Sequence, residues 1–101
     1  MPTTLDEALQ ALDGLLGDED KAFIDKAESP NRMIAFHHNL GRHLRNKWGL
    51  WHGSQLKDHL ASRYGTDEAD ELSGNLLEDY WRIRHHQNPL PTAWDHIAKS
   101  V

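Results

Sequence analysis

Apolar residues recur every three or four positions along most of this chain, which is the spacing of one face of an α-helix. The clearest stretch covers residues 30–48. Its apolar positions are Met33, Phe36, Leu40, Leu44 and Trp48. Ser29 and Pro30 give a helix-start signal before this stretch, and Gly49 follows its last apolar position, where glycine readily ends a helix. The pattern predicts one helix over about residues 30–48, at the centre of the fold.

Gly41 falls inside this predicted helix, where a glycine costs about 1 kcal/mol relative to alanine. A close approach that only glycine permits would offset that cost. We expect this approach to be a crossing of two helices within the chain. The alternative is contact with the backbone of a partner.

Two shorter helical patterns precede the central one. Thr4 and Glu7 have the spacing of a capping box, in which two side chains satisfy backbone N–H groups at a helix start. The apolar stripe of this first helix comprises Leu5, Ala8, Leu9, Leu12, Leu15 and Leu16. Three acids at residues 18–20 favour the start of a second helix, because negative charge there stabilises the helix dipole. Its expected buried face comprises Phe23, Ile24 and Ala27.

Two further helices are predicted after residue 53. Ser54 can cap the first of them, and Gly65 is expected to end it. Its apolar positions are Leu56, Leu60 and Tyr64. The second helix starts near residue 67. Its apolar face comprises Leu72, Leu76, Leu77, Tyr80, Trp81 and Ile83.

Leu50 and Trp51 are large apolar residues in the loop after the central helix, so we expect them to fold back onto the core. Residues 87–101 are expected to form an extended connector and a short C-terminal helix carrying Trp94. No segment alternates with period two, so the sequence predicts an all-α, small single-domain bundle of four to six short helices over residues 1–101. Its core is expected to contain Leu40, Leu44, Trp48, Leu76, Leu77 and Trp81.

The composition is typical of one soluble domain with a small core. Of the 101 residues, 38% are hydrophobic and 27% are charged, so the four tryptophans must supply much of the buried apolar surface. Without cysteine, the chain has no disulfides and no thiol chemistry. No apolar run approaches the roughly 18 residues that span a membrane, and the N-terminus lacks the features of a signal peptide. We therefore expect a cytoplasmic protein.

Charged residues are distributed in blocks. Residues 1–28 carry eight acids and two bases, residues 29–63 carry one acid and six bases, and residues 64–84 carry six acids and two bases. The basic central segment is therefore flanked by acidic ones. We expect these charges to complement each other within the fold. The alternative is a basic surface that binds an acidic partner.

Several residues of the basic segment, with others further on, form a long pattern rich in rare residue types. The pattern is His38-x-Leu40-Gly41-Arg42-x-x-Arg45-Asn46-x-Trp48-Gly49-Leu50-Trp51, followed by Asp70-Glu71-Leu72-Ser73-Gly74 and Tyr80-Trp81-Arg82. It resembles a family of small bacterial and phage proteins defined as a domain of unknown function, and the likeness covers residues 4–84. Glu71 stands where a second aspartate is expected. The resemblance implies no activity and no cofactor.

No residue pattern in the chain indicates catalysis. Eight histidines are present, but those of the central helix lack the i, i+3 or i+4 spacing of a metal-binding pair, and no cysteine completes a set. Serine and histidine form no known catalytic motif, and no glycine-rich loop carries the P-loop lysine. We therefore expect no enzymatic activity, no metal site and no cofactor.

Arginine and tryptophan around the central helix point to binding instead, because these residue types dominate the energetics of protein interfaces. The candidate binding residues are His38, Arg42, Arg45, Lys47 and Trp51. Among them, Arg45 is expected to be mainly structural. It would join the central helix to the start of the last long helix at Asp70 through a charge-assisted hydrogen bond.

These residues suggest a non-enzymatic protein–protein interaction module, such as an inhibitor or adaptor carried by a phage or mobile element. Its partner would be another protein or a second copy of the chain, since an exposed apolar patch on a small domain can pair with itself. The alternative is binding of a small anion, a nucleotide or nucleic acid through Arg42, Arg45 and Lys47. The net charge of −5 argues against nucleic acid.

Overall fold

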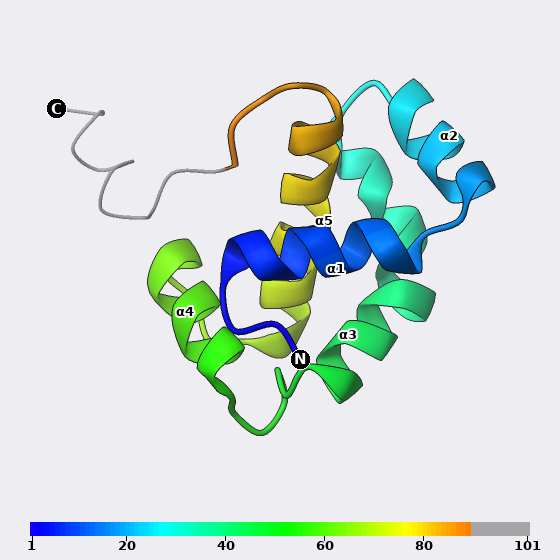
Figure 1. Cartoon of the computed structure of the whole chain (residues 1–101). Coiled ribbons are helices and arrows are strands. Elements are labelled where there is room, and N and C mark those ends of the chain that lie inside the picture. Colours follow the sequence, from blue (N-terminus) through cyan, green and yellow to red (C-terminus); the bar gives the residue numbers. More distant parts are fainter. Residues whose placement is uncertain (90–101) are drawn as a thin grey trace, which may run out of the picture.

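Helix α5 (Ala69–Arg84) is the longest element of the structure and contacts all the others. The computed structural model describes residues 1–89 and shows an all-α fold without strands in that range (Figure 1). The elements before α5 are α1 (Leu5–Leu15), α2 (Asp18–Lys26), η1 (Pro30–Phe36), η2 (His37–Gly41), α3 (Arg42–Lys47) and α4 (Gln55–Tyr64). The predicted small helical bundle is therefore confirmed.

The centre of the bundle differs from the prediction, because α5 rather than the segment over residues 30–48 contacts every other element. Figure 1 shows α1 crossing α5. Eight of the 16 residues of α5 are buried, on more than one side of the helix, so it can pack against several neighbours at once. The expected C-terminal helix with Trp94 lies outside the described residues, and residues 87–89 have no regular structure.

Residues 30–47 are helical throughout, but in three successive geometries. The segment η1 is a 3₁₀-helix, η2 is a π-helix and α3 is an α-helix. Because a 3₁₀-helix winds more tightly and a π-helix more loosely than an α-helix, the side turned toward the core changes along the segment. Met33 and Leu44 are buried, whereas Phe36 and Leu40 are only half-buried at the edge of the core.

The core contains most of the side chains predicted for it. Those that are buried are Leu44, Trp48, Leu76, Leu77 and Trp81, and Leu40 packs against them. Leu50 folds back onto the core as expected, but Trp51 remains 50% exposed. Within residues 1–89, no helix combines the length and the apolar character needed to cross a bilayer.

The start of α1 is capped, but not by the predicted reciprocal pair. The Thr4 hydroxyl accepts a hydrogen bond from the backbone N–H of Glu7 at 3.2 Å, as expected. The Glu7 carboxylate instead accepts from the backbone N–H and the hydroxyl of Thr3, each at 2.8 Å. Both side chains thus fix the first turn of α1, but Glu7 bonds to Thr3 instead of the backbone N–H of Thr4.

Later helix boundaries follow the sequence closely. The Ser54 hydroxyl accepts from the backbone N–H of Lys57 at 3.0 Å and so caps α4. Gly49 and Gly65 end their helices in the left-handed region, with φ of 69° and 73°. A residue with a Cβ is strained in that region, which explains why glycine stands at both positions.

Asp79 of α5 is a fully buried carboxylate that the hydrophobic pattern did not predict. It accepts a hydrogen bond from the Tyr64 hydroxyl of α4 at 2.5 Å, and one from Nη1 of Arg82 at 2.8 Å. Burial, followed by the charge of Asp79, raises the pKa of Tyr64 far above its ordinary value, so the phenol stays protonated and donates. This buried group joins α4 to α5.

Candidate functional site

Arg45 lies inside the fold, with its side chain only 6% exposed. Its Nη1 donates to the Ser73 hydroxyl at 2.9 Å and its Nη2 donates to the carbonyl of His37 at 3.3 Å. Its Nε lies 3.3 Å from a carboxylate oxygen of Asp70. The predicted link to the start of α5 is present, although Asp70 contributes an ion pair and the hydrogen bonds go to other partners.

Gly41 makes room for this arginine. A Cβ at position 41 would lie 2.9 Å from Nη1 of Arg45 and 3.5 Å from the carbonyl oxygen of Phe36. The close approach is therefore made by a side chain one turn further along the same segment, neither by a second helix nor by a partner. Both interpretations from the sequence are replaced by this internal contact.

The four other candidate residues are exposed, but they do not share one face. His38 and Arg42 are about one turn apart on the same side of the segment. Lys47 follows Arg42 by five residues, which at about 100° per residue turns it about 140° away. The ring of Trp51 lies 5.8 Å from the guanidinium carbon of Arg45 and near the acidic start of α5.

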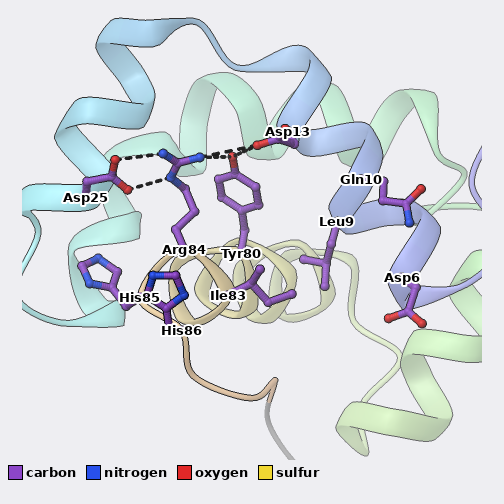
Figure 2. A pocket seen from close by; sticks show the side chains of 10 residues that line it. All are labelled: Asp6, Leu9, Gln10, Asp13, Asp25, Tyr80, Ile83, Arg84, His85 and His86. Carbon is purple, nitrogen blue, oxygen red and sulfur yellow. Dashed lines mark hydrogen bonds and ion pairs between the residues drawn. The ribbon is translucent and has the colours of Figure 1, made fainter.

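A groove of about 810 Å³, the acidic groove, lies between α1 and the C-terminal part of α5, beside α2 (Figure 2). Its lining residues are Asp6, Leu9, Gln10, Asp13, Asp25, Tyr80, Ile83, Arg84, His85 and His86. Leu9 and Ile83 form its apolar part. The groove has three carboxylates and a single arginine, so the electrostatic potential of the groove does not favour an anionic ligand.

One wall of the acidic groove is a network of charged side chains that joins three helices (Figure 2). Arg84 of α5 contacts Asp25 of α2 through two hydrogen bonds, of 2.7 and 2.8 Å. Tyr80 donates to Asp13 of α1 at 2.8 Å, and Lys21 of α2 lies 3.5 Å from the same carboxylate. Burial, followed by the hydrogen bond to Asp13, raises the pKa of Tyr80 to about 12.

His85 at the end of α5 has a structural role. Its ring stacks on Trp81, with centroids 4.0 Å apart, and its Nε2 donates to the carbonyl of Ile24 at 2.9 Å. Trp81 in turn donates to the carbonyl of Ala27 at 3.0 Å, so both rings donate hydrogen bonds to carbonyls at the end of α2. Within residues 1–89, no three histidine, aspartate or glutamate side chains gather in a group that could hold a metal ion.

The network predicts a loss of stability in acid. The hydrogen bonds from Arg84 lower the pKa of Asp25, and the hydrogen bond from Tyr80 lowers the pKa of Asp13. Carboxylates with a lowered pKa in the folded state stabilise it above their ordinary value of 3.8. That stability is lost as pH falls through the lower folded value, because the unfolded chain then binds more protons.

Urea unfolding at a series of pH values from neutral to strongly acidic measures this effect. We expect Asp25→Asn to be less stable than wild type at neutral pH and to show a shallower loss of stability in acid. Asp6→Asn is the matched control, because Asp6 lines the same groove without an ion-pair partner among residues 1–89. Equal acid sensitivity of wild type and Asp25→Asn would contradict this assignment.

A second groove, the aromatic groove, lies where the end of α1, α2 and the η1–η2 segment meet, and its volume is about 490 Å³. Its apolar residues are Leu15, Leu16, Phe23, Ala35, Phe36 and Leu40. The rings of Phe23 and Phe36 meet edge to face, with centroids 5.7 Å apart. Leu15 is 49% exposed and Phe23 is 47% exposed.

The exposure of Phe23 and Leu15 corrects the prediction that both are buried. Only Ile24 is buried within α2, because this short and highly charged helix presents a narrow face to the core. Phe23 and Ile24 are adjacent and therefore about 100° apart on the helix, so one narrow contact cannot cover both. This spacing in the sequence indicates that one of the two residues is exposed, and the structure shows that it is Phe23.

Comparison of the chain with curated proteins and with solved structures gives no match. One family model matches residues 1–84, a range that contains the Arg45 link to α5 and the whole aromatic groove. This match confirms the resemblance to a domain family of unknown function. The chain belongs to the family described as Domain of unknown function (DUF6794).

Proposed function

We propose that this protein acts by binding a protein partner, either another protein or a second copy of the chain, through the aromatic groove, without catalysing a reaction. The observation that carries this proposal is the exposure of Leu15 and Phe23 in one groove. Single exposed apolar residues are ordinary on protein surfaces, whereas apolar side chains gathered in a groove are typical of interaction sites. Aromatic side chains that are already held in place bind at a low entropic cost, and the contact with Phe36 holds Phe23 in this way.

The π-helical segment η2 provides a further argument. Irregular helical turns are frequent at functional sites, and this one carries Leu40 of the aromatic groove and the exposed His38. A regular α-helix through residues 30–47 would turn different residues toward the groove. The fold thus accepts a less regular helix where the groove is built.

The alternative, a small anion, a nucleotide or nucleic acid bound through Arg42, Arg45 and Lys47, has less support from the geometry. Arg45 is held by partners within the fold, and Arg42 and Lys47 point in different directions. The acidic groove carries the wrong charge for an anion. We propose that the protein works in the cytoplasm as an inhibitor or adaptor, as expected for a small binding module of a phage or mobile element.

Affinity capture from a lysate of the natural host tests the proposal. We expect Phe23→Ser to lose the proteins that wild type recovers, including untagged copies of the chain, because it removes the exposed ring of the groove. Ile83→Ser is the matched control, since Ile83 is 40% exposed but lines the acidic groove instead. Both variants must first show the helical circular dichroism of wild type.

Trp51→Ala tests the surface that the sequence suggested first, because the Trp51 ring is 50% exposed. Loss of capture by Trp51→Ala alone would move the contact to the loop after α3. Equal recovery by wild type and Phe23→Ser would contradict binding through the aromatic groove.

A further inference from the structure

We infer that the partner at the aromatic groove is a second copy of this chain, related to the first by a twofold axis. This inference rests on the proposed function and names its partner. It is drawn from charged residues of opposite sign that lie close in sequence to the two edges of the groove.

The part of one edge that is formed by the first turns of α2 is acidic, and we call it the acidic edge. Asp20 lines the groove, and Glu19 and Asp20 precede Phe23 by four and three residues, so both lie about one turn from its ring on the same side of α2. Both carboxylates are exposed. Neither belongs to an ion pair within residues 1–89, in contrast to Asp13 and Asp25 on the other groove.

Basic residues follow the opposite edge in the sequence, and we call this side the basic edge. Asn39 and Leu40 line the groove from η2, and Arg42 and His43 follow Asn39 by three and four residues, about one turn further along. Both side chains are exposed, and within the described part of the chain Arg42 has no carboxylate partner. Figure 1 shows α2 and α3 on either side of the C-terminal end of α1.

A twofold axis through the groove places the acidic edge of one copy against the basic edge of the other. In such an interface residue i of one copy contacts residue j of the other and the reverse, so every favourable pair occurs twice. Asp20 of each copy would pair with Arg42 of the other, so the pair occurs at both ends of the interface. Between these pairs, the Phe23 ring of each copy would pack into the apolar groove of the other. An unrelated partner would have to reproduce both edges, whereas a second copy already carries them.

Paired charge reversal tests this arrangement. We expect wild type to show a concentration-dependent dimer in sedimentation velocity, up to millimolar concentration. Asp20→Lys and Arg42→Glu are each expected to be monomeric, because each sets two like charges against each other. A mixture of these two single variants should form heterodimers in native mass spectrometry, since both pairs then have opposite charges again. The double variant, Asp20→Lys with Arg42→Glu, should dimerise by itself.

Two controls make the result specific. Asp6→Lys reverses an exposed charge at the acidic groove and should dimerise like wild type. Phe23→Ser should be monomeric while it keeps its fold. A dimer that persists in both single charge variants would overturn the twofold arrangement. A wild type that stays monomeric would show that the partner is not a second copy. The proposed function would still stand in that case if Phe23→Ser lost a protein that wild type recovers in the affinity capture.

Discussion

Asp79→Ala is expected to lower the free energy of unfolding by about 3–5 kcal/mol, the usual cost of breaking a buried ion pair. Asp79 is fully buried, and its removal leaves Arg82 without its closest anion and the Tyr64 hydroxyl without its acceptor. Small domains have a total stability of roughly 5–15 kcal/mol, so this single change is expected to remove a large share of it. Urea unfolding followed by circular dichroism measures the loss.

Glu78→Ala is the matched control for this prediction. Glu78 precedes Asp79 on the same helix and lies 3.9 Å from the same arginine, but its side chain is 31% exposed. Water screens that pair, so its loss should cost less than about 1 kcal/mol. Asp79→Asn, which keeps an acceptor for Tyr64, is expected to be intermediate and remains measurable if the alanine variant does not fold. Equal costs for the Asp79 and Glu78 alanine variants would refute a special role of the buried carboxylate.

Arg45→Ala is expected to cost about 2–3 kcal/mol, because hydrogen bonds of a charged donor and the packing of its aliphatic stem are both lost. The cost should stay below that of Asp79→Ala, since Asp70 is 60% exposed and its carboxylate is solvated by water when the arginine is removed. Arg42→Ala, an exposed residue one turn away, should change stability by only about 0.5 kcal/mol or less. Unchanged stability of Arg45→Ala together with loss of partner binding would make Arg45 a binding residue instead.

A second substitution, Gly41→Ala, tests the contact between Gly41 and the Arg45 guanidinium. The contact and the helix propensity of alanine change the free energy of unfolding in opposite directions. Gly41→Ala in wild type should destabilise the protein, because the new Cβ lies 2.9 Å from Nη1 of Arg45 and displaces a bonded group. In the Arg45→Ala background that clash is absent, and the better helix propensity of alanine should add up to about 1 kcal/mol. A stabilising Gly41→Ala in wild type would show that the arginine moves away freely.

The sequence pattern was sufficient for the local features of the fold. Helix starts at Thr4 and Ser54 and the glycine stops at Gly49 and Gly65 were predicted from neighbouring residues and are present in the structure. These features depend on backbone N–H groups and φ angles within a few residues of the signal. The link between Arg45 and Asp70 was also predicted, because blocks of opposite charge in a small domain have few places to meet.

The features that matter for binding were decided by tertiary packing. Periodicity identifies an apolar face but not how much of it a neighbour covers, so Phe23 was expected inside and is half-exposed. Asp79 follows the buried Leu76 by three residues on the same face of α5, but the partner that joins it to another helix, Tyr64, was not evident from the pattern. The winding over residues 30–47 changes from 3₁₀ to π to α where this segment packs against α5, and the apolar spacing of the sequence predicted one continuous helix there. The sequence by itself therefore determined the helices and their ends, and the tertiary structure decided which side chains were left to bind, since burial depends on contacts between residues far apart in the chain.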